Sequence, residues 1–299
     1  MVIKESIGDR VFNTAMYVLL GIILLLCAYP IWYVIICSIS SPYYINNGQV
    51  LLWPKGVTLE GYAAVFQEPS VLIGYRNSIL YTVFGTLLAL IVTLPAAYAV
   101  SRNDFVGHNF FMAVITFTMF FSGGMIPAYL VVQRLGLINS PFCLIVLGTV
   151  SAYDVILCRT FFQNSIPHEL QDAAEIDGCS NFKLFVSVIL PLSKPIIAVM
   201  VLFIAVGKWN NYFTALLYLT NPNLQPLQLV LYNLLLKSDT LAKMIEQGVV
   251  DAGDVQKSMN IQQLIRYSLI VTASVPVMLL YPLIQKYFVK GVMIGSVKG

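Results

Sequence analysis

Long apolar runs constrain this chain more than any other feature of its sequence. About 20 mostly apolar residues are needed to cross the hydrocarbon core of a bilayer, and six runs reach that length. They are Phe12–Ser38, Asn77–Ser101, Asn109–Val132, Pro141–Phe162, Pro195–Thr220 and Leu264–Phe288. The chain is 58% hydrophobic and 10% charged, whereas a soluble domain carries about 25% charged residues. The sequence therefore predicts an all-α polytopic membrane protein and excludes a water-soluble enzyme.

The distribution of lysine and arginine predicts how these spans are oriented in the cell membrane. With both termini in the cytoplasm, about nine basic residues are internal and about seven are external. This bias places residues 163–194 in an internal loop. The external connections are then 39–76, 133–140 and 221–263. Three regions are expected: 1–76 with the first span and its external loop, 77–288 with a core of five spans, and a cytoplasmic tail at 289–299.

The sequence lacks the motifs of several enzyme classes. It contains no GxxxxGK[ST] phosphate loop, no HExxH or zinc-type Cys/His spacing, and no GxSxG nucleophile turn. Its net charge of +3 is too small and too scattered for a nucleic-acid surface. We therefore expect no catalytic residue, no bound metal or cofactor and no nucleic-acid partner. Any energy from ATP must come from a separate subunit.

The predicted internal loop contains a short acidic helix. Pro167 suits its first turn, and Gly178 is suited to a left-handed helix end. Leu170, Ala173 and Ala174 are spaced as one helical face, and paired alanines leave that face shallow. On these residues alone, a plain surface linker and a helix that docks into a partner's groove are both open.

The same loop resembles the EAA loop of binding-protein-dependent ABC importer permeases, whose pattern is E-A-A, three residues, G, nine residues and then I-x-L-P. Here Asp172-Ala173-Ala174 stands for E-A-A, Gly178 follows at the family's interval, and Val188-Ile189-Leu190-Pro191 comes nine residues later. Asp172 and Val188 depart from the pattern, and both are conservative in charge or volume. The resemblance implies a type I ABC importer (MetI-like) permease fold with six transmembrane helices.

Further segments resemble the MalG-type permeases of carbohydrate-uptake importers. They are Phe121–Pro127, Trp209–Phe213 and Lys290–Gly299. Matches within Ser41–Tyr62 and at Gln225–Gln228 are similar to the LplC/YtcP-type branch, which serves complex-polysaccharide fragments, including uronate-bearing oligosaccharides. The resemblance implies one half of a permease heterodimer that imports oligosaccharides by ATP-driven alternating access.

The resemblance also implies partners and contact residues. The partners are a second homologous permease, two ATPase subunits that bind ATP and Mg, an extracellular solute-binding protein, the oligosaccharide and the lipid bilayer. In that family the EAA helix inserts into a groove on the ATPase, and the tail reaches the ATPase dimer. The coupling residues carried over are Glu169, Asp172, Ala173, Ala174, Asp177, Gly178, Leu190 and Pro191. The tail contacts carried over are Gly295, Lys298 and Gly299.

Polar side chains at membrane depth mark a candidate cargo path, because such groups are costly there. The candidates are Asp154, Lys208, Trp209, Asn210, Asn211 and Tyr212. In one interpretation Lys208 offsets cargo carboxylates while the aromatic and amide groups contact sugar. In the other, Lys208 pairs with Asp154 and the asparagines hold helices together. Likewise, Gly123-Gly124 and Pro127 predict either a broken helix at a gate or close packing with a kink.

Two alternatives differ in function. An ion-gradient-driven secondary transporter needs no ATPase, and such folds often carry several intramembrane carboxylates. Asp154 is the only acidic residue well inside a predicted span, which argues against that class. An ABC permease for a non-sugar solute such as an amino acid, a peptide or a polyamine is opposed only by the carbohydrate-type segments.

Overall fold

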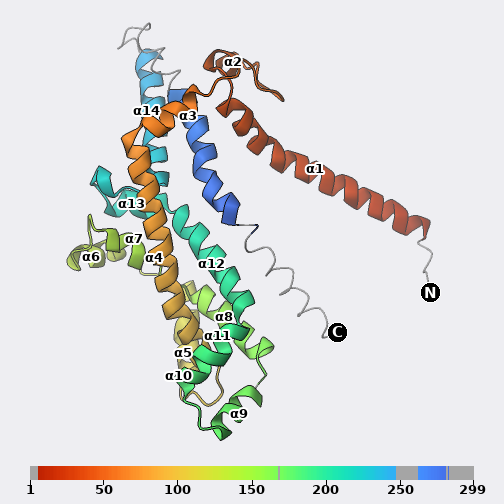
Figure 1. Cartoon of the computed structure of the whole chain (residues 1–299), viewed down its shortest axis with the longest axis vertical. Coiled ribbons are helices and arrows are strands. Elements are labelled where there is room, and N and C mark those ends of the chain that lie inside the picture. The colour runs from red at the N-terminus through yellow and green to blue at the C-terminus, as the bar shows by residue number, and fades with distance from the viewer. Residues whose placement is uncertain (1–5, 168, 247–261, 281, 283–299) are drawn as a thin grey trace. The chain divides into compact units, whose positions relative to one another are not determined.

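The computed structural model describes residues 6–167, 169–246, 262–280 and 282, and the regular structure within those ranges is helical (Figure 1). The labelled helices are α1 (Ile7–Ser38), α2 (Pro42–Asn46), α3 (Glu60–Gln67), α4 (Pro69–Ala99), α5 (His108–Phe120), α6 (Met125–Arg134), α7 (Pro141–Val146), α8 (Ala152–Ser165), α9 (Glu169–Ile176), α10 (Asn181–Leu184), α11 (Leu190–Leu192), α12 (Lys194–Trp209), α13 (Tyr212–Tyr218) and α14 (Leu227–Glu246). A π-helix, η1, covers Phe185–Ile189, and a 3-10 turn, η2, covers Pro222–Leu224. A further helix covers Gln262–Leu280. The predicted all-helical fold class is confirmed.

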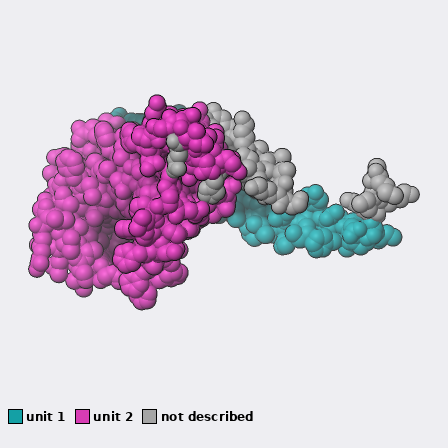
Figure 2. Space-filling view, turned by 90° about the horizontal axis from the view of Figure 1, so that it is seen from below, with its two compact units in different colours: residues 1–69, 233–274 teal, residues 70–232, 275–299 magenta. Residues whose placement is uncertain are grey.

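The chain divides into two compact units (Figure 2). The first unit comprises residues 1–69 and 233–274, and the second comprises residues 70–232 and 275–299. The predicted internal loop and the candidate path residues belong to the second unit.

The second unit is built on α4, which buries side chains along most of its length. Gly74 permits close backbone contact, because a Cβ there would lie 3.0 Å from the Cα of Leu227. Near the other end of α4, the Tyr98 ring stacks on Phe185 with 5.2 Å between centroids and meets Phe162 edge-on. The buried cluster around Tyr98 includes Leu94, Ala97, Val155, Cys158, Ile189 and Met200. This cluster joins α4 to α8, η1 and α12 and forms the main core of the unit.

The spans are less continuous than the hydropathy pattern predicts. Among the described residues, three helices are long and apolar enough to cross a membrane: Ile7–Ser38, Pro69–Ala99 and Gln262–Leu280. The number rises to five if two bent helix pairs each count as one span. One of these pairs is α5 and α6, which meet at 112°. The other joins Asn181–Leu192 to α12 at 80°.

The break between α5 and α6 decides between the two interpretations of the glycines. Gly124 adopts φ +86°, outside the helical region, and the helix stops at Phe120. A Cβ built at Gly123 or Gly124 would meet only Pro127, at 4.0 Å. The prediction of close helix packing is therefore wrong within this chain, and the helix is broken. A gate at this break stays a prediction.

Two other predicted spans are also interrupted. Residues 141–162 form α7 and α8, which are separated by an irregular stretch containing Gly148 at φ +67°. Residues 195–220 form most of α12 and all of α13, which are separated at Asn210 and Asn211. Apolar composition alone does not distinguish one long helix from two short ones, because glycine and capping residues at the break change mean hydropathy little.

The first unit has a small core at the end of α1. Ile36 and Cys37 pack there with Ile45 and Val50 from the following segment. An isolated antiparallel bridge joins Ser40 to Val57 and closes that segment at its base. The rest of α1 is mostly exposed, as expected for a helix that faces lipid.

Candidate coupling loop and polar cluster

The end of α9 has the geometry that its sequence predicts. Gly178 adopts φ +67°, the left-handed conformation that glycine tolerates best. The Cys179 N–H donates to the Ala174 carbonyl at 2.8 Å, which is the outer hydrogen bond of a Schellman cap. The helix is therefore closed by its own backbone, and the left-handed end predicted for Gly178 is confirmed.

The two faces of α9 differ from the prediction at one position. Leu170 and Ala174 pack against the main core, but Ala173 is exposed. On a helix, Ala173 and Ala174 lie on opposite sides of a line drawn along the axis through Leu170, because they follow it by three and four residues. The core covers only the Ala174 side. Ile176, one turn after Ala173, is 87% exposed. The prediction that Leu170, Ala173 and Ala174 share one displayed face is thus wrong, since Leu170 and Ala174 face the core and Ala173 faces outward.

The exposed stripe of α9 combines acidic and apolar side chains. Glu169, Asp172, Ala173 and Ile176 are all exposed and follow i, i+3, i+4, i+7 spacing. Asp177 and Gly178 are exposed just beyond the helix. We call Glu169, Asp172, Ala173 and Ile176 the α9 stripe. The sequence does not predict Ile176 as a contact residue, because the E-A-A pattern includes Ala173 and Ala174 but not Ile176.

The segment after the loop contains a wide helical turn. Leu190 and Pro191 lie in α11, directly after the π-helix η1. Proline has no N–H, and its ring clashes with the carbonyl four residues earlier, so a wide turn upstream relieves that contact. Ser193 then ends α11, and its hydroxyl donates to the Ile189 carbonyl at 2.6 Å. Leu190 and Pro191, which match the I-x-L-P end of the pattern, therefore lie at the bend that leads into α12.

A buried arginine ties this region to the end of α4. Arg102 donates through Nε to Asp104 at 2.7 Å, and through Nη1 to Asn181 at 3.2 Å and to the Tyr98 hydroxyl at 3.3 Å. Hydrogen bonds from the Arg102 guanidinium hold the pKa of the Asp104 carboxyl below its ordinary value. Asn181 is the first residue of α10, so Arg102 connects the base of the loop to α4. Sequence reasoning missed this residue, which lies just past a predicted span.

Side chains from α8 fasten the same turn after α4. Arg159 donates to the Val100 carbonyl at 3.1 Å, and Gln163 donates to the Ser101 carbonyl at 3.3 Å. Both donors come from α8, one turn apart. They satisfy the carbonyls of the two residues that directly follow α4. The turn at residues 100–104 is thus held by α8 as well as by α10.

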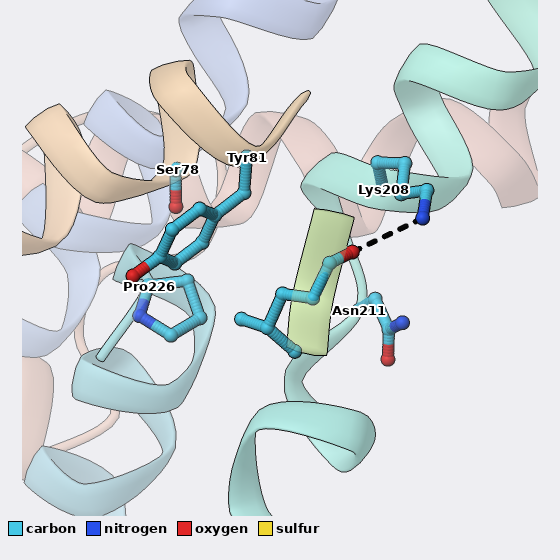
Figure 3. Close-up of a pocket in the computed structure, with 6 residues that line it drawn as sticks. Ser78, Tyr81, Lys208, Asn211 and Pro226 are labelled. Carbon is cyan, nitrogen blue, oxygen red and sulfur yellow. Dashed lines mark hydrogen bonds between the residues drawn. The ribbon is translucent and has the colours of Figure 1, made fainter. Parts of the chain in front are cut away.

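Lys208 occupies a different position from either interpretation of the sequence. Its Nζ donates to three backbone carbonyls, those of Leu144 and Ile145 at 3.1 Å and of Leu147 at 2.7 Å. Figure 3 draws one of these hydrogen bonds as a dashed line from Lys208. These carbonyls lie at the C-terminal end of α7, where a cation is favoured by the helix dipole. All three ammonium protons are used.

The predicted Lys208–Asp154 ion pair is wrong. Among the described residues, the ion pair that forms joins Arg102 to Asp104. The physical reason is the break after α7, which presents open carbonyls at the place where hydropathy predicts a continuous helix. Asp154 instead lies in the first turn of α8, where its N–H donates to the Ser151 capping hydroxyl at 3.4 Å.

The other path candidates have separate structural roles. Trp209 is 5% exposed, and its ring lies 6.2 Å from that of Tyr75. The Asn211 side chain caps α13 by accepting from the Thr214 N–H at 3.1 Å. Asn210 is exposed, and Tyr212 is exposed and stacks on Tyr232 with 5.2 Å between ring centroids. Asn210 and Tyr212 are therefore the exposed residues of this group, and the Asn210 side chain accepts from Gln228 at 3.5 Å.

Polar residues of α4 hold the turn that follows α13. Asn77 donates to the carbonyls of Asn223 and Gln225 at 2.9 and 3.0 Å, and the Tyr81 hydroxyl donates to the Leu224 carbonyl at 2.9 Å. Ser78 accepts from the Leu227 N–H at 2.8 Å. The sequence feature that indicates this contact is the spacing of Asn77, Ser78 and Tyr81, at i, i+1 and i+4 inside an apolar run. It was missed there.

A small recess lies between this turn and Lys208 (Figure 3). It is lined by Ser78, Tyr81, Leu144, Lys208, Asn211 and Pro226. Its volume of about 10 Å³ is close to the space one water needs, so a sugar ring does not fit. Among the described residues, no group of three or more His, Cys, Asp or Glu side chains is placed to hold a metal ion. The predicted tail contacts Gly295, Lys298 and Gly299 lie outside the described residues.

Comparison with known proteins supplies the family. The family described as "Binding-protein-dependent transport system inner membrane component" matches residues 70–294. Protein LplC of Bacillus subtilis (strain 168) is 38% identical and covers 98% of this chain and 96% of its own. The polygalacturonan/rhamnogalacturonan transport system permease protein YtcP of the same organism is 37% identical over 97% of this chain and 99% of its own.

A solved structure agrees with these relatives. It is the crystal structure of a bacterial ABC transporter involved in the import of the acidic polysaccharide alginate. A chain of that transporter matches with a TM-score of 0.85 and 32% identity, over 96% of this chain and 100% of that chain. Members of the family are membrane-embedded transport subunits and not enzymes. This chain belongs to the binding-protein-dependent transport system inner membrane components, the permease subunits of ABC importers.

Proposed function

We propose that this chain forms one half of a permease heterodimer that imports uronate-bearing oligosaccharides. Two relatives support the cargo class, since YtcP is named for polygalacturonan and rhamnogalacturonan and the solved transporter for alginate. All three are acidic polysaccharides. Both termini of the chain are cytoplasmic, and an extracellular binding protein delivers the cargo.

The observation that carries the coupling role is the α9 stripe. Ile176 and Ala173 give this stripe a small apolar surface, and Glu169 and Asp172 surround it with negative charge. An exposed isoleucine on a helix that already has a packed opposite face is suited to a hydrophobic groove. We assign that groove to an ATPase subunit. ATP and Mg are bound there, and the tail residues Gly295, Lys298 and Gly299 contact the same ATPase dimer.

Motion of the α9 stripe is passed into the bundle by two connections. One runs through α10 and η1 to Leu190 and Pro191 at the 80° bend into α12. The other runs through Asn181 and Arg102 to the end of α4. Asp177 and Gly178 join α9 to both connections. Displacement of α9 by the ATPase therefore moves α4 and α12 together, which alternating access requires.

Fewer residues of this chain contact the cargo than the six that the sequence predicts. Asn210 and Tyr212 remain candidates, because both are exposed. Three other residues shape the path instead. Lys208 binds the end of α7, Trp209 packs on Tyr75, and Asn211 caps α13. Asp154 acts at the start of α8. Most sugar contacts then come from the second permease.

A reconstituted complex tests this proposal. This chain, the second permease, the ATPase and the binding protein are placed in proteoliposomes, and uptake of an oligogalacturonide is measured beside binding-protein-stimulated ATP hydrolysis. Ile176→Glu is expected to reduce both activities by at least about tenfold, because a charge cannot enter an apolar groove without a large desolvation cost. Val106→Glu is the matched control, since Val106 is 91% exposed and lies outside the α9 stripe.

The outcomes separate the two parts of the proposal. Normal activity of the Ile176→Glu complex contradicts docking through the α9 stripe. Uptake of an amino acid or a peptide with no uptake of any oligogalacturonide contradicts the cargo class and leaves the coupling role in place. Uptake without any ATPase subunit contradicts the importer mechanism.

A further inference from the structure

The segment that follows α1 folds back alongside that helix. Val50 is 1% exposed and packs in the small core of the first unit with Ile36 and Ile45. The next three residues, Leu51, Leu52 and Trp53, are 61%, 59% and 72% exposed. We call Leu51–Trp53 the finger. It presents three large apolar side chains outward from a fixed base.

The backbone of the finger is hydrogen-bonded to α1. The Trp32 indole N–H donates to the Leu52 carbonyl at 2.9 Å, and the Tyr29 hydroxyl donates to the Leu51 carbonyl at 3.3 Å. The rings of Trp32 and Trp53 meet edge-on at 6.4 Å. Exposed carbonyls in water need no protein donor, whereas carbonyls that enter an apolar phase do. The two aromatic donors thus fit a finger that lies against lipid.

The position of the finger along α1 fits the thickness of a bilayer. No Asp, Glu, Lys or Arg lies between Arg10 and Lys55. Tyr29 is 19 residues after Arg10, which is about 28 Å at 1.5 Å per helical residue. The hydrocarbon core is about 30 Å thick. With Arg10 at one interface, Tyr29, Trp32 and the finger therefore lie at the other, where tyrosine and tryptophan concentrate.

A charge next to the finger completes the pattern. Lys55 is exposed and follows Trp53 and Pro54. A lysine beside an interfacial tryptophan reaches anionic headgroups while the ring stays at the edge of the acyl chains. We propose that the finger inserts into the leaflet at the C-terminal end of α1 and fixes the depth of that helix in the bilayer. The occupant of this apolar surface is lipid.

Fluorescence in nanodiscs tests the insertion. The full chain is placed in nanodiscs that contain phosphatidylglycerol and phosphatidylcholine brominated near the headgroup, at carbons 6 and 7 of one acyl chain. Trp53 emission is obtained as the difference between wild type and Trp53→Phe. We expect this difference emission to be strongly quenched by the brominated lipid and little affected by aqueous iodide.

A matched variant moves the reporter to the base of the segment. Val57→Trp in the Trp53→Phe background places the indole beside Ser40, two residues beyond the end of α1. That position is about 12 Å further along the axis than Trp32 at 1.5 Å per residue. Its emission should be quenched by iodide and less by the brominated lipid. Leu52→Asp should make Trp53 accessible to iodide, while Leu59→Asp, another exposed leucine of the external segment, should not.

Two results would overturn the proposal. If iodide quenches Trp53 in the wild-type chain, the finger faces water. If neither quencher reaches Trp53 in the assembled complex, a protein partner covers the finger. A chain with Leu52→Asp that fails to insert still leaves the wild-type quenching measurement decisive.

Discussion

Lys208 shows how a single charge is accommodated at membrane depth. Its ammonium group donates to three carbonyls at the break after α7, one of which, that of Ile145, also accepts from the Thr149 hydroxyl. The arrangement satisfies both partners, because the carbonyls need donors and the charge needs acceptors. Gly85 on α4 makes room for the lysine stem, since a Cβ there would lie 3.1 Å from Lys208 Cε.

We predict that Lys208→Met destabilises the protein while Asp154→Asn does not. Methionine preserves the apolar stem but removes the ammonium donor from the Leu144 and Leu147 carbonyls, at about 1–3 kcal/mol for each buried group. The Ile145 carbonyl still accepts from the Thr149 hydroxyl at 2.9 Å. Thermal unfolding of the two variants in the same detergent measures the difference. Equal losses of stability would instead support an ion pair between positions 208 and 154.

The Arg102–Asp104 pair predicts a dependence of stability on pH. The folded pKa of Asp104 is lowered, so its contribution is present above the unfolded pKa of about 3.9 and is lost as pH falls through the folded value. The Asp104 side chain is 58% exposed, so solvent screens the effect and its size is small.

The measurement is the unfolding temperature of wild type and Asp104→Asn between pH 3 and pH 7. The two curves should be separated at neutral pH and approach each other below about pH 4. A constant separation across the whole range would show that Asp104 acts by packing and not by charge. Glu60→Gln is a suitable control, because Glu60 is exposed at the start of α3 and forms no ion pair in the described part of the chain.

Among the elements, α9 is the one whose structure follows most directly from local sequence. Its acidic first turn, its eight-residue length and its glycine end are all local properties. Its exposed face is not, because Ala173 and Ala174 have the same side chain and only the core decides which is covered. The same limit explains why Trp209 was predicted to line the cargo path. Trp209 is buried by Tyr75 of α4, a contact with no trace in the local sequence.

Gly178→Val should uncouple ATP hydrolysis from uptake while membrane insertion continues. A β-branched residue in a left-handed conformation costs about 1–2 kcal/mol, so the Schellman cap opens and α9 loses its orientation. The space around Gly178 is open, so the effect arises from the backbone and not from a clash. Gly178→Asn, which tolerates the left-handed region, should restore most of the uptake in the reconstituted complex. Wild-type uptake by the valine variant would contradict the prediction.

The broken helices show the limit of hydropathy at this scale. The six apolar runs identify the membrane class, and the all-helical fold is confirmed. The breaks at Gly124 and Gly148 are visible as glycines but not as breaks, since glycine also occurs within intact α4 at Gly74 and Gly85. Backbone conformation at a glycine depends on what packs around it, and that information is distributed over the whole unit. The proposed region boundaries at residues 76 and 288 stay predictions.

At the scale of the whole molecule, the chain leaves many large apolar side chains uncovered. On α5, none of the residues is buried, and Phe110, Phe117 and Phe120 are all exposed. Large exposed apolar surface marks contact with lipid or with another protein. Lipid or a partner subunit is therefore the expected cover of this surface, in keeping with a family whose permeases work in pairs with ATPases and a binding protein.

We predict that the tagged chain, purified from its native membrane in mild detergent, carries a second six-span protein and a P-loop ATPase. Mass spectrometry of the purified material identifies them. Ile176→Glu should reduce the recovered ATPase and leave the second permease, because in our proposal the α9 stripe docks on the ATPase alone. A chain that stays alone even after cross-linking of intact cells would favour a gradient-driven carrier.

The Lys208 ammonium is hydrogen-bonded to the backbone of its own subunit. This has a consequence for how the cargo of the transporter changes during evolution. A subunit that holds no free counter-charge at that position does not itself discriminate between a polyanion and a neutral chain there. We therefore expect selection of an acidic cargo to be independent of Lys208. We expect a new delivery protein to redirect this permease to another oligosaccharide without any substitution at position 208.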